Sequence, residues 1–172
     1  VEANYEDGNL HGTFKMYQEK GKPKVQGDYH KGIRTGVWLK FNSNGSVYTQ
    51  DLYRHGSLKS TKRENGEFTD YYDSGIPKSV VNYKKGNKEG EFMEYYDIGE
   101  FVQEETPGKM GGPEEIIEQL VGTQVKMKGW YVNDQLNGKV TYYNEDGSTS
   151  RVEVWENGTL VSTIDWEVKG NE

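Results

Sequence analysis

The sequence predicts an all-β protein built from tandem β-hairpins, and two observations support this prediction. The first is a phrase that recurs along the chain and is clearest at residues 29–45: a tyrosine, two glycines, two aromatic residues and a further glycine. The second is the spacing of its copies, since Tyr5, Tyr29 and Tyr53 follow one another at intervals of 24 residues. A repeat of this length indicates that one supersecondary unit recurs along the chain, and the pattern favours an almost wholly antiparallel meander.

The turns of these hairpins are marked by polar residues that end in glycine, as at residues 42–45, 73–75 and 144–147. Asn and Asp favour the start of a turn, and glycine takes the positive φ that closes a hairpin without a Cβ clash. We therefore expect positive φ at the four glycines that share this slot: Gly45, Gly75, Gly99 and Gly147.

The first aromatic position of each copy is expected to stack from repeat to repeat, as cross-strand neighbours do, and it holds Phe14, Trp38, Phe68 and Phe92. Trp38 and Phe41 lie three residues apart, so on a flat strand they would face opposite sides of the sheet. Either both faces are partly covered or a bulge turns the strand, and the sequence leaves both alternatives open.

The phrase resembles the MORN repeat, and more closely the variant form of bacteria, with Asn-Gly or Asp-Gly turns. The resemblance covers about residues 5–99 and 131–158, and departs from the pattern at Asp134 and Val140. It implies tandem hairpins that form one elongated, twisted antiparallel sheet. Some bacterial relatives carry an antitoxin label.

The composition supports a single domain of stacked repeats over residues 1–172. Hydrophobic residues make up 32% of the chain and glycine numbers 22, which is too little aliphatic material for a large two-layer core. The chain has no cysteine, which excludes disulfides, thiolate zinc sites and thiol nucleophiles.

The net charge of −7 argues against nucleic-acid binding and against membrane association by charge. The chain opens with Val1 rather than methionine. Two localisations stay open on this ground: the cell envelope or exterior of a bacterium with an export signal removed, or otherwise the cytoplasm.

Two insertions interrupt the repeats. Residues 57–65 include a small basic cluster of Lys59, Lys62 and Arg63. We interpret this segment as a lengthened, solvated hairpin loop, and the alternative is a contact for an anion or a partner. Residues 104–124 form the second insertion and lack the aromatic-glycine phrase.

Within the second insertion, residues 113–121 are predicted to form a short helix. Pro113 suits the first helical position, the acidic residues after it complement the helix dipole, and Ile116, Ile117, Leu120 and Val121 fall on one helical face. About nine residues cannot hold a helix alone in water, so we expect this face to pack on the sheet. The alternative is a partner-binding helix that uses Ile116, Ile117 and Leu120.

The second aromatic position of each copy is the candidate binding strip. Tyrosine pairs occur here at residues 71–72 and 95–96, and near the end at 142–143, and successive strand residues point to opposite faces. One ring of each pair is expected to pack between hairpins, while the outer ring is open to a partner. The candidate binding residues are Tyr17, Phe41, Tyr71, Tyr95 and Tyr143.

No motif in the sequence indicates catalysis, since no nucleophile motif, phosphate loop or dinucleotide fingerprint occurs. The three histidines, His11, His30 and His55, do not supply a converging metal-ligand set. A glycosidase would need two carboxylates across a cleft, which an open sheet does not offer. We therefore predict no enzymatic activity, no catalytic residue, no metal and no cofactor.

Two functions from different classes remain. The first is a non-enzymatic binding or scaffolding module that uses an extended sheet surface for a protein or glycan partner. The alternative is an antitoxin-like inhibitor that covers a basic effector protein. The first predicts an aromatic, weakly charged contact face, whereas the second predicts clustered carboxylates and binding that weakens in salt.

Overall fold

The computed structural model describes residues 1–106 and 115–165. All regular elements within these ranges are β-strands. The described residues therefore contain no helix that is long and apolar enough to cross a membrane. The strands are β1 (Glu2–Glu6), β2 (Asn9–Tyr17), β3 (Pro23–His30), β4 (Ile33–Phe41), β5 (Val47–Arg54), β6 (Ser57–Arg63), β7 (Gly66–Tyr71), β8 (Pro77–Lys84), β9 (Asn87–Tyr95), β10 (Glu100–Thr106), β11 (Glu115–Val121), β12 (Val125–Val132), β13 (Gln135–Leu136), β14 (Gly138–Tyr143), β15 (Thr149–Glu156) and β16 (Thr159–Asp165).

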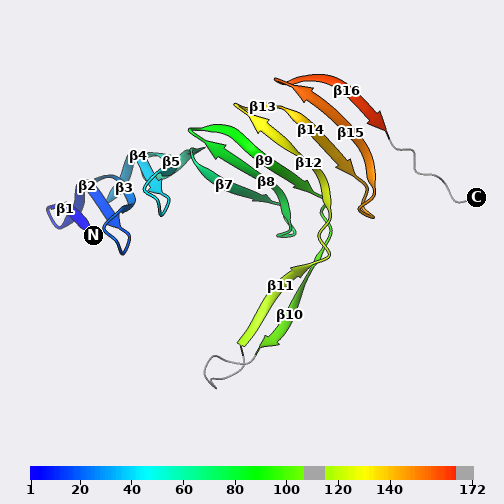
Figure 1. The fold of residues 1–172 in the computed structure, drawn as a ribbon. Helices are drawn as coiled ribbons and strands as arrows, with labels where there is room; N and C mark the ends of the chain where they lie inside the picture. Colours follow the sequence, from blue (N-terminus) through cyan, green and yellow to red (C-terminus); the bar gives the residue numbers. More distant parts are fainter. Residues whose placement is uncertain (107–114, 166–172) are drawn as a thin grey trace, which may run out of the picture. The chain divides into compact units, whose positions relative to one another are not determined.

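The strands form three sheets (Figure 1). Strands β1 to β6 make a six-stranded sheet in chain order, and β10 pairs with β11. The eight-stranded sheet has the order β16-β15-β14-β12-β9-β8-β7, with β13 beside β12. The prediction of an all-β fold of antiparallel hairpins is therefore confirmed, whereas the prediction of one continuous sheet is wrong.

The chain divides into two compact units. Unit 1 consists of Val1–Phe68 and Asn82–Lys88, and unit 2 consists of Thr69–Val81 and Glu89–Glu172. The assignment of residues 1–172 to one domain stays a prediction.

The hairpin turns follow the sequence closely. The backbone N–H of Gly45 donates to the carbonyl of Asn42 at 2.9 Å, and the same bond closes the turns at Gly21, Gly75 and Gly147. The φ values of Gly45, Gly75, Gly99 and Gly147 are 93°, 86°, 138° and 84°, which confirms the predicted positive φ. These turns end their strands because only glycine takes this conformation without strain.

A β-bulge lies opposite Phe41, in the partner strand. Lys40 of β4 faces Thr49 of β5, but Phe41 faces Val47, so one residue of β5 is left over. The same slip occurs opposite Tyr17 and Tyr143, where Lys24 of β3 and Ser150 of β15 are left over. Because the extra residue lies in β5, the alternation of side chains within β4 is kept, and this bulge does not decide between the two alternatives that the sequence left open.

The core of unit 1 is a row of aromatic rings along the sheet. Trp38 is only 2% exposed, and its ring centroid lies 5.8 Å from that of Phe14 and 5.0 Å from that of Tyr29. The stacking predicted for Phe14 and Trp38 is therefore confirmed. Gly27 lies between these two rings, and a Cβ at this position would come within 2.2 Å of the Trp38 ring. Only glycine fits there.

Unit 2 repeats this arrangement with different residues. Phe92 of β9 faces Gly129 of β12, and a Cβ on Gly129 would lie 2.8 Å from the Phe92 ring and 2.9 Å from Val140. Val140 replaces the aromatic residue of the repeat and is fully buried. The departure from the pattern at this position therefore leaves the core row intact.

The first insertion is a strand and not the predicted loop. Residues Ser57–Arg63 form β6, which pairs with β5 from Arg54↔Ser57 to Thr49↔Arg63. The extra residues complete the six-stranded sheet, and the chain then resumes the repeat at Glu64. Backbone hydrogen bonds to β5 satisfy this segment, which a solvated loop would have left to water.

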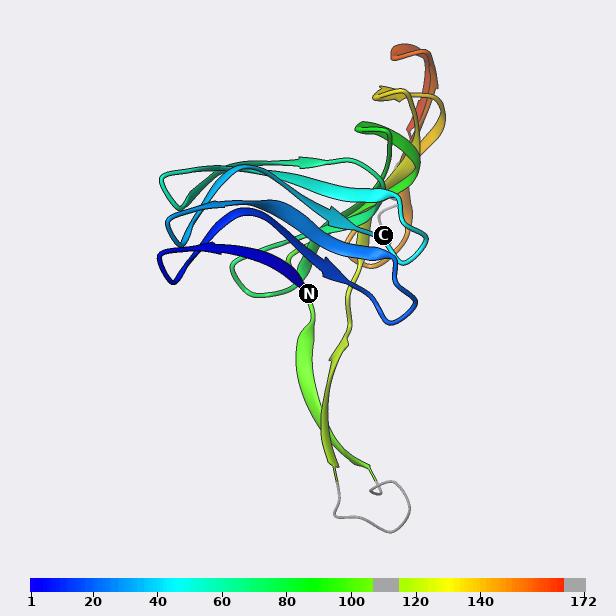
Figure 2. The same ribbon diagram turned by 90° about the vertical axis from the view of Figure 1, so that its left-hand side faces the viewer.

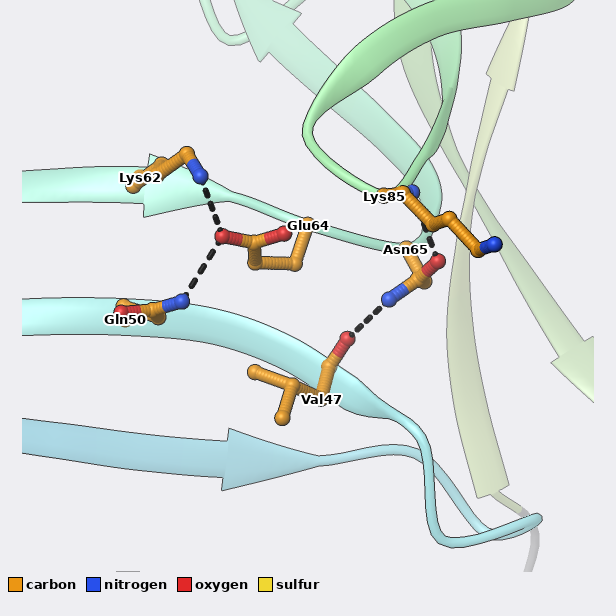
Figure 3. A network of polar contacts seen from close by, with 6 residues as sticks. All are labelled: Val47, Gln50, Lys62, Glu64, Asn65 and Lys85. Atoms are coloured by element: carbon orange, nitrogen blue, oxygen red, sulfur yellow. Dashed lines mark hydrogen bonds and ion pairs between the residues drawn. The ribbon is translucent and has the colours of Figure 1, made fainter.

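Two residues join β6 to β7, and both are held by polar contacts within unit 1 (Figure 3). The Glu64 carboxylate accepts a hydrogen bond from Gln50 at 2.8 Å and pairs with Lys62 at 2.6 Å. The Asn65 amide donates to the Val47 carbonyl at 2.8 Å and accepts from the Lys85 backbone N–H at 2.9 Å. Side-chain hydrogen bonds and an ion pair thus hold the chain in the connection that follows β6, the last strand of the six-stranded sheet.

The predicted helix at residues 113–121 is wrong where it can be compared. Glu115–Val121 forms β11, paired with β10 from Glu100↔Val121 to Thr106↔Glu115, while Pro113 and Glu114 lie outside the described residues. The β-branched residues of this run favour a strand once a partner strand is present. Ile116 and Ile117 are 65% and 37% exposed, so they do not pack on a sheet as predicted.

Candidate binding surface

Each of the five candidate aromatic residues is the last residue of its strand. Tyr17 and Phe41 end β2 and β4 in unit 1. Tyr71, Tyr95 and Tyr143 end β7, β9 and β14 in unit 2. Tyr71 is exposed and the other four are half-buried, so each ring keeps some surface that a ligand could contact.

In unit 1, Tyr17 and Phe41 line one open depression of about 410 Å³. Lys24 of β3, the strand between them, lines it too. The remaining lining residues are Gln18, Glu19 and Ser43. Two rings flanked by a lysine and a carboxylate give apolar surface together with hydrogen-bond donors and acceptors, as a peptide or sugar would require.

Tyr17 is also tied to the neighbouring strand. Burial, and then a hydrogen bond to the Glu2 carboxylate, raise the pKa of Tyr17 above its usual value near 10.0. Glu2 lies on β1, the strand beside β2.

Gln18 and Asn42, the residues after Tyr17 and Phe41, hold successive repeats together in unit 1. The Gln18 side chain donates to the Asn42 carbonyl at 2.9 Å, and the Asn42 side chain donates to the Asn65 carbonyl at 3.0 Å. Both acceptors lie about one repeat further along the chain. These bonds set the spacing of the turns that follow Tyr17 and Phe41, and so pre-organise the depression.

Tyrosines take the same role in unit 2. The Tyr72 hydroxyl donates to the Tyr95 carbonyl at 2.7 Å, and the Tyr96 hydroxyl donates to the Tyr143 carbonyl at 2.8 Å. In the pair at 71–72, one ring is therefore structural while Tyr71 is exposed, which is the division expected from sequence. The pair at 142–143 is shifted by one position, because Tyr142 precedes the aromatic slot instead of following it.

Cations accompany the aromatic residues of unit 2. The Lys128 ammonium lies 5.5 Å from the ring centroid of Tyr143, and a hydrogen bond to Tyr143 raises the pKa of Lys128. Lys78 and Lys126 lie similarly over Tyr72 and Tyr96, at 5.6 and 5.7 Å. These cation–π contacts place positive charge beside the candidate strip of an acidic protein.

Two arginines cover the buried aromatic row of unit 1, and our sequence reasoning gave neither of them this role. The Arg34 guanidinium lies 4.5 Å from the Trp38 ring centroid, and Arg63 lies 5.1 Å from that of Phe68. A hydrogen bond with Tyr29 is the main cause that raises the pKa of Arg34. Arg34 lies between Gly32 and Gly36, shortly before Trp38. This position is the sequence signal that could have identified Arg34 as the residue that covers the tryptophan ring.

The basic cluster of the first insertion is largely used inside unit 1. Lys62 pairs with Glu64 and Arg63 covers Phe68, so two of its three cations have a structural role. The alternative of an anion contact at this cluster therefore gains no support from the geometry.

The histidines do meet at one end of unit 1. The rings of His11 and His30 lie 4.9 Å apart, and His30 and His55 line a small cavity of about 130 Å³. Across residues 1–106 and 115–165, however, no group of three His, Cys, Asp or Glu residues could hold a metal ion.

Three buried carboxylates are each ion-paired. Asp51 lies 2.9 Å from the Lys40 ammonium, and Glu153 lies 3.1 Å from the Arg151 guanidinium. Glu64 has the partners described above. The Lys40–Asp51 pair joins two adjacent strands, whereas the other two cations lie two residues from their carboxylates along the chain, so all three buried acids have structural partners.

Comparison with known proteins identifies the repeat. The family model described as "MORN repeat variant" matches residues 10–31 and 64–85. The first match contains Tyr17 and Lys24 of the depression, and the second contains Tyr71. A search of curated proteins finds no match to the chain.

Proposed function

The chain is a MORN repeat protein with repeats of the variant type, and on this premise we propose that it is a non-enzymatic binding or scaffolding module for a protein or glycan. The contact residues are Tyr17 and Phe41 in unit 1 and Tyr71, Tyr95 and Tyr143 in unit 2. MORN repeats generally mediate binding or scaffolding, and the finer assignment to these five residues is our own.

The depression lined by Tyr17 and Phe41 is the observation that carries this proposal. It combines two half-buried rings, a lysine and a carboxylate at a position that recurs with the repeat. Inter-repeat hydrogen bonds hold the turns behind it in place. A rigid aromatic surface binds with little loss of conformational entropy, because each ring has only two rotatable side-chain bonds.

A second candidate function is an antitoxin-like inhibitor that covers a basic effector. One observation favours it: the strands β10 and β11 carry five glutamates and no lysine or arginine. Such a protein would use its carboxylates and not its aromatic strip. The two functions therefore predict different responses to salt, since charge pairing at exposed sites is screened.

The test is affinity capture from an extract of the source cell, with three forms of the chain immobilised. We expect the wild type to retain a partner that the Tyr17→Ala/Phe41→Ala variant loses. Tyr5→Ala is the matched control, because Tyr5 is an exposed tyrosine of the same unit that does not line the depression. Retention of the same partner by all three forms would refute the proposed surface.

Digestion of the extract separates the classes of partner. A partner lost after protease treatment is a protein, and one lost after glycosidase treatment is a glycan. Elution by about 0.5 M salt alone would favour the inhibitor, whereas salt-resistant binding that requires Tyr17 and Phe41 supports the aromatic surface.

A further inference from the structure

The hairpin of β10 and β11 in unit 2 pairs only with itself among the described strands. Figures 1 and 2 show it leaving the ends of β9 and β12 and extending away from the strands of the same unit. The outer edges of both strands therefore keep backbone groups that no third strand satisfies within the described residues. An isolated two-stranded hairpin is marginally stable in water, and a third strand would complete it.

Both faces of this hairpin combine apolar side chains with glutamates. Alternation and the register place Phe101, Leu120 and Ile116 on one face, together with Glu105 and Glu118. Phe101 and Ile116 are exposed, so this apolar surface is available to a partner.

The opposite face has the same character. Val102, Ile117 and Val121 lie on it with Glu100 and Glu104, and the Gln119 side chain donates to Glu104 at 3.1 Å. Neither strand contains a lysine or arginine, although the chain as a whole has 21. The hairpin thus concentrates negative charge and exposed apolar surface in one element.

We propose that this hairpin docks an extended segment of a basic protein, which adds beside it as a third strand and places lysine or arginine among its glutamates. Backbone pairing along a free strand edge supplies affinity, and alternate side chains supply specificity. The complementary charge selects a basic segment. A second copy of this chain would bring the same glutamates into contact, and an anionic lipid surface would be repelled in the same way.

This inference goes beyond the proposed aromatic surface, because it uses neither Tyr17 nor Phe41, and it deepens the second candidate function, which rests on the same glutamates. The depression belongs to unit 1 and the hairpin to unit 2. Variants of one surface leave the other intact, so failure of one proposal is distinguishable from failure of the other.

The probe is a synthetic peptide of about seven residues in which lysine and valine alternate, titrated into the full chain by calorimetry. We expect binding that weakens as salt rises from about 0.05 to about 0.5 M. Peptides that alternate lysine with glycine, or glutamate with valine, should bind at least about tenfold more weakly, because each lacks one half of the complementarity. Equal binding of the lysine-glycine peptide, or no binding of the lysine-valine peptide, would overturn the proposal.

The charge variant is Glu104→Lys/Glu105→Lys/Glu118→Lys. All three residues are exposed, so the fold should be kept, which circular dichroism verifies. We expect the affinity for the lysine-valine peptide to fall at least about tenfold.

The matched control carries the same change in net charge elsewhere, at the exposed residues Glu67, Glu145 and Glu156, none of which lines the depression. Each is replaced by lysine, and the affinity should fall less than about threefold. An equal loss in both triple variants would show that only net charge attracts the peptide, and would overturn the hairpin as the site.

The contribution of the apolar side chains to peptide binding is tested with Ile116→Ser, and Ile164→Ser is its matched control. The two isoleucines are 65% and 55% exposed and both lie on strands, so they form a close pair. Only Ile116→Ser should lower the affinity of the chain for the lysine-valine peptide. If sedimentation instead shows a dimer of the wild type that Ile116→Ser abolishes, a second copy covers the hairpin and the proposal fails.

Discussion

Gly27→Ala tests the packing of the aromatic row more directly than any other change. The new methyl group would lie 2.2 to 2.5 Å from three atoms of the Trp38 ring, where ordinary contacts begin near 3.4 Å. The ring would have to move by about 1 Å. It is held by neighbouring rings and by its indole N–H, which donates to the Asp28 carbonyl at 3.2 Å.

Overpacking of this kind costs about 1–3 kcal/mol of stability and sometimes more. Because the Trp38 ring is held on several sides, we expect Gly27→Ala to lower the free energy of unfolding by about 3 kcal/mol. For a chain of this length, that corresponds to a melting temperature lower by about 6–12 °C. Gly129→Ala should cost less, because its nearest contact would be 2.8 Å. Thermal unfolding followed by circular dichroism measures both changes.

A double-mutant cycle with Trp38→Leu separates the clash from other effects of an added methyl group. The smaller side chain leaves room for the Cβ, so Gly27→Ala should cost less in the Trp38→Leu background, with a coupling of about 1–2 kcal/mol. An unchanged melting temperature for Gly27→Ala, or strict additivity in the double variant, would refute the contact between this position and the ring.

Three further predictions concern a turn, an ion pair and a pH response. Gly45→Val should cost about 1 kcal/mol or more, because φ at this turn is 93°, whereas Gly45→Asn should cost less; equal melting temperatures would contradict the turn assignment. Lys40→Met should destabilise the chain by about 1–2 kcal/mol, because it leaves the Asp51 carboxylate buried without its cation, and Asp51→Asn should cost less; urea unfolding ranks them. Burial, and then a hydrogen bond to Glu153, raise the pKa of Tyr142, so its contribution to stability is full below its usual pKa near 10.0 and is lost as pH rises through the raised value. Tyr142→Phe should therefore flatten the fall in stability at alkaline pH, measured by urea unfolding at several pH values, and an identical fall in both proteins would count against this role.

The sequence by itself determined the hairpin repeat, because turn chemistry is local. Gly45 and its counterparts lie a few residues from the strands that they connect, and their need for positive φ depends only on their own backbone. The aromatic positions follow the same 24-residue period, so the five strand-ending residues could be named without a structure. Their surroundings could not, because Lys24 reaches the depression of Tyr17 and Phe41 from β3, the strand between them.

The tertiary structure decided the two insertions, because their conformation depends on partners distant in the chain. The run Ile116–Ile117 with Leu120 fits one face of a short helix as well as a strand, and pairing with β10 selects the strand. Likewise, residues 57–63 become β6 because β5 offers them an open ladder of hydrogen bonds. Short segments have weak intrinsic preferences, so the strand beside them determines which structure they adopt.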